Sequence, residues 1–269
     1  MNILEIIPIM DPNNLWTGPH RVVFDVSKAL ARKGHNVTVC TSDMSDIKTR
    51  IATISETSLE GFKIVRLKNV NKYLSNAIGL VITPELNNFL SSNIQDYDIV
   101  HCHEYTTFEN IFLHHYAKKY DIPYVIQAHG SILRIGKKAR KLFYDVIFGQ
   151  NILRDATKVI ALTRMEAQQY RDMSVNENKI AIISNGIDLT EYSDLPPKGT
   201  FKKKYNIQHK PKMILFLGRL HRTKGIDLLI KAYAHLIKTD NQHNTVLVIA
   251  GPDDGFLIEA ISLVNSLSL

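Results

Sequence analysis

The sequence has 269 residues, enough for one large domain or two, and 45% of them are hydrophobic, as in an ordinary globular chain. Its formal net charge of +7 predicts anionic partners, either phosphorylated substrates or an acidic membrane surface. Because the sequence has no basic arm and no recognised nucleic-acid-binding motif, we expect no nucleic-acid partner.

The cysteines and the N-terminal sequence predict the compartment. Cys40 and Cys102 each lie in an apolar, strand-like run, which indicates buried thiols in a reducing environment. No leader-like segment precedes the first predicted strand, and no apolar run reaches membrane-spanning length. We therefore expect a cytoplasmic protein.

The N-terminal stretch predicts a βαβ unit of a parallel sheet. Ile3–Ile9 is an apolar run interrupted by Glu5 and one proline, apolar residues recur at helical spacing from Val22 to Leu30, and Val37–Thr41 is again strand-like. No Gly-x-Gly-x-x-Gly follows the first strand, which argues against a dinucleotide-dependent oxidoreductase. Gly18, in the loop before the helix, is either a turn glycine or a point where the backbone closely approaches a phosphate.

Further apolar runs and helical stripes extend this α/β pattern along the chain. The strands expected are Phe62–Leu67, Asp98–Glu104, Pro123–Ala128, Lys158–Thr163 and Lys179–Ser184, and helices are expected to start near Pro84, Phe108 and Glu166.

Polar residues gather at the end of the strand Asp98–Glu104, where His101, Cys102, His103 and Glu104 are consecutive. In open α/β sheets, ligands bind at the carboxyl ends of the strands. The spacing also suggests a zinc site, but successive side chains of a strand point to opposite faces and the sequence shows no second ligand cluster. We therefore favour a binding site without a metal.

His129 follows the strand Pro123–Ala128 and precedes Gly130. A histidine in this position can present its imidazole to a site at the carboxyl end of the strand. The alternative is a structural histidine that caps the next segment.

A basic run, Lys137–Lys141, precedes an apolar stripe from Leu142 to Leu153. Such a segment can dock on an anionic membrane. We favour the other interpretation, in which the charges are the solvated face of a packed helix.

Near the C-terminus, the apolar run Met213–Leu217 predicts a strand buried on both faces. Arg219 and Lys224 lie in the short turn that follows, and a helical stripe starts after Gly225. A basic turn beside a helix N-terminus can bind a phosphate group. The alternative is a solvated basic turn, and the spacing alone favours neither.

The last part of the chain predicts one more strand, Thr245–Ala250, and a final helix from Phe256 to Leu267. Asp253 and Asp254 lie between them. We interpret this pair as part of an Asp-Gly turn rather than as a metal site.

The segment FLGRLHRTKGIDLLIKAYAHL, Phe216–Leu236, resembles the donor-domain signature of family 4 glycosyltransferases, which are retaining enzymes with the two-domain GT-B fold. The resemblance extends to Thr17–Pro19 with Arg32–Val37, to Asp98–His103, to His129-Gly130 and to the turn Ser184–Asp188.

This resemblance implies roles for individual residues. Arg219 and Lys224, with the backbone of Gly18, are expected to bind the diphosphate of a nucleotide-sugar donor. His129 is the expected catalytic residue, as an orienting or hydrogen-bonding group, and His103 and Glu104 are expected on the acceptor side. His129 need not be a base, because retention in the family is ascribed to same-face attack assisted by the leaving phosphate. The resemblance also implies no cofactor and no metal.

The resemblance also implies the fold and its division. We expect a GT-B type α/β fold with a Rossmann-like parallel-sheet domain at 1–195, a linker at 196–211 and a partial, βαβα donor domain at 212–269. The family pattern continues beyond Leu269 with a pair of glutamates that bind the donor's sugar and ribose, so we expect a truncated donor domain. A complementing chain could supply the rest.

Two functions follow from these features. The first is a hexosyltransferase of polysaccharide or glycolipid biosynthesis, with a glycan or lipid-linked acceptor and a location in the cytoplasm or at the inner face of the membrane. The second is a non-catalytic remnant or accessory subunit that binds an acceptor or a partner chain.

Overall fold

The computed structural model describes residues 1–13, 18–47, 49–51, 56–70, 73, 81–132, 138–207, 212–239 and 244–269. Thr17 of the predicted loop, Lys137 of the basic run and residues 208–211 of the predicted linker lie outside this part. The chain divides into two compact units, Met1–Leu189 and Thr190–Leu269, and each is described by itself.

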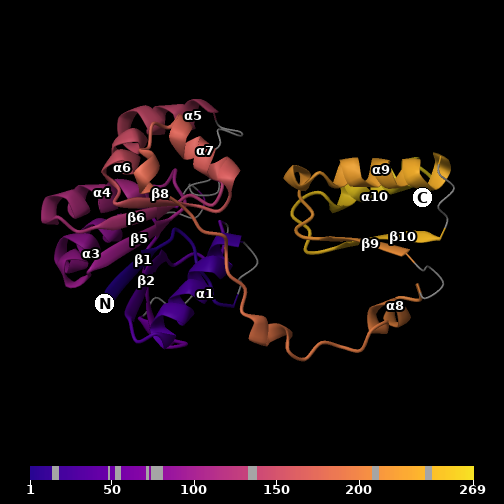
Figure 1. Cartoon of the computed structure of the whole chain (residues 1–269), viewed down its shortest axis with the longest axis horizontal. Coiled ribbons are helices and arrows are strands. Elements are labelled where there is room, and N and C mark those ends of the chain that lie inside the picture. Colours follow the sequence, from indigo (N-terminus) through magenta and orange to yellow (C-terminus); the bar gives the residue numbers. More distant parts are fainter. Residues whose placement is uncertain are drawn as a thin grey trace. The chain divides into compact units, whose positions relative to one another are not determined.

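Within the described residues, the first unit is built on an eight-stranded sheet in the order β3-β4-β2-β1-β5-β6-β7-β8 (Figure 1). Its strands are β1 (Asn2–Ile6), β2 (Asn36–Ser42), β3 (Thr57–Leu59), β4 (Phe62–Leu67), β5 (Ile99–His103), β6 (Tyr124–Gln127), β7 (Lys158–Ala161) and β8 (Ile180–Ile182). All neighbours are parallel except β3 and β4, which are antiparallel.

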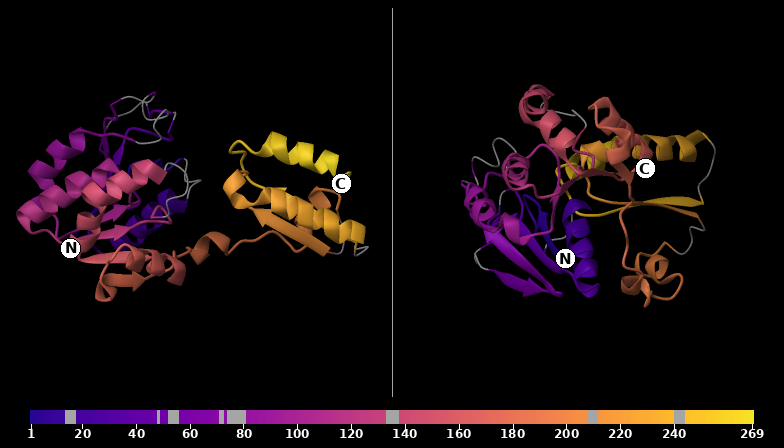
Figure 2. Two further views of the ribbon diagram at one scale, coloured as in Figure 1. Left: turned by 90° about the horizontal axis from the view of Figure 1, so that it is seen from above. Right: turned by 60° about the vertical axis from the view of Figure 1, so that its left-hand side comes forward.

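Helices flank both faces of this sheet (Figures 1 and 2). They are α1 (Gly18–Arg32), α3 (Glu85–Asn93), α4 (Phe108–Tyr120), α5 (Lys138–Tyr144), α6 (Gln150–Asp155) and α7 (Arg164–Asp172), with short turns of helix at Ile94–Asp96 and Glu177–Lys179. A further turn of helix, Leu189–Tyr192, begins at the last residue of the first unit and continues into the second. A larger core, which includes Leu4 and Ile6, packs under α3, α4 and α6, and a smaller core, which includes Ile3 and Ile7, packs under α1. Cys40 and Cys102 are buried free thiols, as predicted.

Several strands start or end one or two residues inside the predicted ranges, and two larger differences have a physical cause. β1 ends at Ile6 rather than Ile9, because Pro8 has no N–H to donate to a neighbouring strand. The antiparallel strand β3 was not predicted. Its connection to β4 is a tight turn at Glu60 and Gly61, both with positive φ (51° and 89°), and a single glycine is a weak hairpin signal in the sequence.

The segment from α5 to α6 contains a π-helical turn, Asp145–Gly149. Ile152 and Leu153 are buried, but Leu142, Phe143, Val146 and Ile147 are exposed. The favoured interpretation, a helix whose apolar stripe is packed, is therefore wrong for the first half of this segment, because no other described element covers that face. Among the described residues, no helix combines the length and apolarity needed to cross a membrane.

The second unit contains a parallel pair of strands, β9 (Lys212–Leu217) and β10 (Thr245–Ala250), and the helices α8 (Thr200–Lys204), α9 (Ile226–Thr239) and α10 (Leu257–Ser266), with a 3-10 turn at Arg222–Lys224. Helices α9 and α10 lie on one side of the strand pair (Figure 1). Their core contains Leu220, Ile226, Ile230, Phe256 and Ala260.

The other side of β9 is open among the described residues. Met213, Leu215 and Leu217 are 37%, 51% and 77% exposed, so the prediction of a strand buried on both faces is wrong. The sequence pattern was that of a doubly covered strand, but the two helices cover only the face to which Phe216 points.

Candidate functional site

The first candidate site lies at the carboxyl ends of three adjacent parallel strands, β1, β5 and β6. In the register of the sheet, Glu5 of β1 is opposite His101 of β5, and His103 of β5 is opposite Gln127 of β6. Since alternate residues of a strand share a face, His101 and His103 lie on the same face as Glu5. His129 comes two residues after the end of β6.

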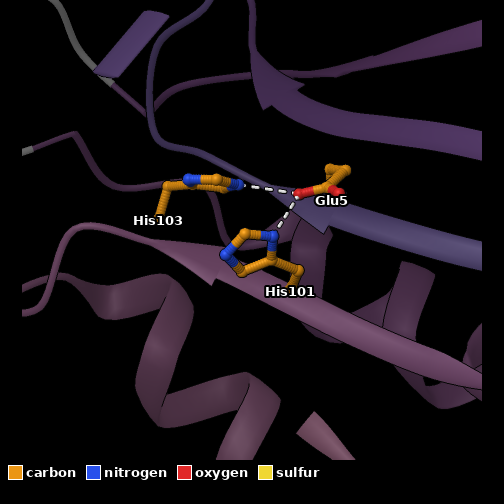
Figure 3. A group of neighbouring side chains, drawn as sticks. All are labelled: Glu5, His101 and His103. Carbon is orange, nitrogen blue, oxygen red and sulfur yellow. Dashed lines mark hydrogen bonds and ion pairs between the residues drawn. The ribbon is translucent and has the colours of Figure 1, made fainter. Parts of the chain in front are cut away.

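Glu5 joins the two histidines of β5 (Figure 3). Its Oε2 atom lies 3.0 Å from His101 Nδ1 and 2.7 Å from His103 Nε2. Burial alone would raise the pKa of the Glu5 carboxyl, but the electrostatic attraction and hydrogen bond of His101, and next the hydrogen bond of His103, outweigh burial and lower this pKa to about 2. Glu5 is therefore an ionised carboxylate at neutral pH, although it is fully buried.

His103 connects Glu5 to His129. His103 Nδ1 lies 2.9 Å from His129 Nε2, and the two rings are stacked with centroids 5.2 Å apart. Burial, and next the neighbouring His101, lower the pKa of His103 to about 4 despite Glu5. Burial and the other two histidines lower the pKa of His129 to about 3. Both imidazoles are therefore neutral at pH 7.

Glu5, His101 and His103 also bring three ligand-type atoms within 4.8 Å of one another, which is close enough for one cation. The separations of 2.7 and 3.0 Å from Glu5 Oε2 are those of charge-assisted hydrogen bonds. Tetrahedral ligands at about 2.0–2.2 Å from a zinc ion lie more than about 3 Å apart, so a cation would need these contacts to open. The described geometry favours hydrogen bonding, and the expected absence of a metal stays a prediction.

The backbone around His129 is held in an unusual conformation. His129 has a φ of 52°, in the left-handed region that residues other than glycine rarely adopt, and Gly130 has a φ of 81°. Glu166 of α7 fixes this turn, since its carboxylate accepts hydrogen bonds from the backbone N–H of Gly130 and of Leu162, both at 2.6 Å. The Ser131 hydroxyl donates to the carbonyl of Ala128.

Glu104 faces a separate cavity of about 200 Å³, whose charged lining residues are Glu104, Glu109, Arg140 and Lys141. Burial and then Glu109 raise the pKa of the Glu104 carboxyl to about 7. Lys141 donates to the carbonyl of Ser131 at 3.0 Å. The structure thus brings His103 together with His129, but it places Glu104 in different surroundings from His103.

Gly18 is exposed and is the first residue of α1. Its φ lies outside the left-handed region, and a Cβ added there would meet no atom within 4 Å. The backbone therefore does not require glycine at this position, and close approach of a phosphate stays a prediction.

The second candidate site is the turn between β9 and α9. Arg219 forms an ion pair with Asp254, Nη1 to Oδ2, at 2.7 Å. Lys224 is exposed, has no ion-pair partner among the described residues, and ends the 3-10 turn just before α9. The backbone thus forms the predicted turn at a helix N-terminus. Of the two side chains expected to bind phosphate, Arg219 is already paired with Asp254.

The turns after β9 and β10 are packed against each other. A Cβ at Gly251, whose φ is 148°, would overlap the carbonyl oxygen of Gly218. The N–H of Leu220 donates to the carbonyl of Pro252, and Asp253 Oδ1 accepts the backbone N–H groups at the start of α10. Asp253 is a turn and capping residue, in agreement with the sequence interpretation.

Sequence reasoning missed Glu5 and Glu166 as site residues. The signal for Glu5 was a single charge inside the otherwise apolar first strand. The signal for Glu166 was the pattern Thr163-Arg-Met-Glu166, a capping box in which Thr163 caps α7 and the carboxylate turns towards Gly130 instead of its own helix.

Comparison with known proteins identifies the family of this chain. Residues 16–191 match the family model described as Glycosyltransferase Family 4, and residues 197–265 match that described as Glycosyl transferases group 1. An uncharacterized glycosyltransferase of Methanocaldococcus jannaschii is 27% identical over an alignment of 259 positions, and the alignment covers 89% of this chain. A D-inositol 3-phosphate glycosyltransferase of Corynebacterium aurimucosum is 25% identical over an alignment of 272 positions, and the alignment covers 92% of this chain. The chain spans 62% and 61% of the lengths of these two relatives.

Solved structures share the fold at low sequence identity. Anabaena HepE in complex with UDP superposes with a TM-score of 0.72 at 14% identity, over 100% of this chain and 67% of that chain. A glycosyltransferase from Rickettsia africae superposes with a TM-score of 0.67 at 18% identity, over 100% of this chain and 65% of that chain.

Proposed function

The chain belongs to glycosyltransferase family 4 and has the GT-B type α/β fold, and from this we propose that it transfers a sugar from a nucleotide-diphosphate sugar to a glycan or lipid-linked acceptor, with retention of configuration. The observation that carries the proposal is the position of His129. It is a neutral, partly buried imidazole at the carboxyl ends of three parallel strands, held through His103 by the ionised Glu5.

Arg219 and Lys224 are proposed to bind the donor diphosphate. The turn after β9 supports this role, because Arg219, Arg222 and Lys224 lie in it beside the N-terminus of α9, where a helix dipole favours negative charge. Gly18, in the first unit, is proposed separately as a point where the backbone closely approaches a phosphate. The solved structures of HepE that share this fold contain UDP and UDP-glucose. These ligands support a nucleotide sugar as the donor class for this chain.

His129 is proposed to orient the reacting sugar through a hydrogen bond. A pKa lowered to about 3 makes His129 a poor proton acceptor at neutral pH, so it is not suited to be a general base. This agrees with a retaining mechanism in which the leaving phosphate assists attack on the same face of the sugar. No cofactor or metal has a part in the proposed mechanism.

Calorimetric titration of the chain with UDP, GDP and ADP tests the donor part of the proposal. We expect saturable binding of at least one nucleotide, together with a higher melting temperature at saturating ligand. Absence of binding by all three nucleotides to the folded chain would contradict a complete donor site in this polypeptide.

The open face of β9 favours a second candidate function. Met213, Leu215 and Leu217 form an exposed apolar row on that strand. We therefore retain the alternative that the chain is an accessory or split subunit, in which another polypeptide covers this row and completes the donor site. Size-exclusion chromatography with light scattering distinguishes a chain that is monodisperse alone from one that self-associates through this row.

A further inference from the structure

Three side chains from distant parts of the first unit are hydrogen-bonded in series. Glu5 Oε2 lies 2.7 Å from His103 Nε2, and His103 Nδ1 lies 2.9 Å from His129 Nε2 (Figure 3 shows the first of these contacts). Each contact uses a different nitrogen of the His103 ring. The protonation of one nitrogen therefore determines the role of the other.

The first contact fixes the proton on His103. An ionised carboxylate has no hydrogen to donate, so His103 Nε2 must be the N–H donor to Glu5. Burial holds the pKa of His103 near 4, so the ring carries one proton at neutral pH and Nδ1 has a lone pair.

The second contact transfers this constraint to His129. Because His103 Nδ1 can only accept, His129 Nε2 must be the donor in the 2.9 Å contact. His129 is also neutral, so its remaining nitrogen, Nδ1, carries a lone pair. Among the described residues, no protein group hydrogen-bonds to His129 Nδ1.

We propose that Glu5 and His103 are positioning residues that hold the imidazole of His129 in its Nε2–H form and leave Nδ1 as a hydrogen-bond acceptor for a sugar hydroxyl. The sugar as the donor of that bond rests on the proposed function, whereas the tautomer does not. Glu5 acts on His129 through His103 and does not touch the substrate.

The surroundings of the series support a positioning role. His101 is a second donor to Glu5 Oε2, which helps to keep the carboxylate ionised in a fully buried place. Glu166 holds the backbone of the adjacent Gly130, so the ring and the main chain of this loop are fixed by separate carboxylates. A buried ionised group is costly unless it is hydrogen-bonded, and Oε2 of Glu5 has two histidine donors, both from β5.

Two-bond ¹H–¹⁵N NMR correlations of the full chain, labelled with ¹⁵N-histidine, test the proposal, because Nδ1 and Nε2 shifts report the tautomer of each ring. His103→Gln and His129→Gly identify the two spin systems. Between pH 6 and pH 8 we expect both rings to have a protonated Nε2 and an unprotonated Nδ1.

Two substitutions at Glu5 separate the tautomer effect from packing. Glu5→Gln retains an acceptor oxygen for His103, so His129 should keep the Nε2–H form. Glu5→Leu removes the acceptor, so His103 should move its proton to Nδ1 and donate to His129, which then becomes the Nδ1–H form. Asp43→Asn is the matched control, since Asp43 is a buried carboxylate paired with Arg50 and has no bond to these rings.

An Nδ1–H form or a mixture at His129 in the native chain would overturn the proposal, whether or not either Glu5 variant folds. An unchanged His129 spectrum in folded Glu5→Leu would overturn it as well. So would stoichiometric zinc in the purified chain, measured by mass spectrometry, with His103 Nε2 bound to it. The NMR measurement uses no donor or acceptor substrate. Failure of nucleotide binding would therefore contradict the proposed function without affecting the tautomer result.

Discussion

Glu5 and His103 are 98 residues apart in the sequence, yet Glu5 Oε2 accepts a hydrogen bond from His103 Nε2 at 2.7 Å. The contact exists because β1 lies beside β5 in the sheet and the register sets Glu5 opposite His101. Through His103, the carboxylate of Glu5 in β1 therefore acts on His129 in the loop after β6.

Removal of the basic side chains of the second unit should weaken donor binding. Arg219→Ala and Lys224→Ala should each reduce the binding free energy of the nucleotide diphosphate by roughly 1.5–3 kcal/mol, the scale of a charge-assisted hydrogen bond. Titration calorimetry measures this loss. Lys231→Ala is the matched control, because Lys231 is exposed on α9 away from the turn and should leave the affinity unchanged.

Asp254→Asn tests the competition for Arg219. Since Asp254 pairs with Arg219 at 2.7 Å, loss of its charge should leave diphosphate affinity equal or higher. A drop in affinity as large as that of Arg219→Ala would show that the ion pair, rather than the free cation, makes the site. The same titration decides between these outcomes.

Loss of the His129 imidazole should separate binding from turnover. His129→Ala should leave the nucleotide dissociation constant within about twofold, which is less than about 0.5 kcal/mol, and abolish sugar transfer. Transfer is measured with a radiolabelled nucleotide sugar, in this chain or in the complex that completes it. Full activity of the variant would remove His129 from the site.

Glycine and alanine at position 129 should give the chain different stabilities. Because φ is 52°, His129→Gly should be more stable than His129→Ala by about 1 kcal/mol, although both lose the same imidazole. Urea unfolding of the two variants measures the difference. Equal stabilities would mean that the loop relaxes out of the left-handed conformation when the ring is removed.

Stability should fall as the pH drops from about 6.5 towards 4. The folded pKa values of His103 and His129 are lowered to about 4 and 3 from a reference of 6.5, so the unfolded chain binds more protons in this window. Their contribution is complete above pH 6.5 and is lost as pH falls towards the folded values. The two extra protons on the histidines of the unfolded chain correspond to a slope of about 2.7 kcal/mol per pH unit near pH 5. Glu104, whose folded pKa is raised to about 7, opposes this slope by roughly 1 kcal/mol per pH unit, so the net fall is smaller.

Urea unfolding at several pH values measures this slope. His129→Gly should lower it by about 1.4 kcal/mol per pH unit, the contribution of one proton, since one of the two histidines is gone. A slope unaffected by His129→Gly would show that His129 titrates alike in both states.

The exposed apolar residues of α5 and the adjoining π-helical turn predict membrane binding. Phe143→Ser with Val146→Ser should reduce cosedimentation with anionic phospholipid vesicles at least several-fold, since both side chains are 64% exposed. Met165→Ser is the control, because Met165 is 72% exposed on α7. Equal cosedimentation of the native and doubly substituted chains would exclude docking through this face.

The sequence predicted most of the parallel strands, because each is a short apolar run bounded by turns. It predicted His129 and His103 from their positions at strand ends. It could not predict that these two side chains touch, because the contact depends on which strands are neighbours in the sheet. The order of strands in the sheet differs from their order in the chain: β1 lies between β2 and β5, although β2 directly follows β1 in the chain.

Long-range polar pairs explain the remaining differences. Asp254, 35 residues after Arg219, pairs with it only because β9 and β10 end side by side. The apolar pattern of Met213–Leu217 is that of a strand covered on both faces. Periodicity alone does not show whether helices cover one face of the sheet or both.

Glu166 links the start of α7 to the loop that carries His129. Its carboxylate accepts hydrogen bonds from the backbone N–H groups of Gly130 and Leu162, so the main chain of this loop is tied to α7 as well as to β6. The imidazole of His129 is held separately, through His103. Loss of the Glu166 carboxylate should therefore release the main chain at Gly130 without removing the contact that orients the ring.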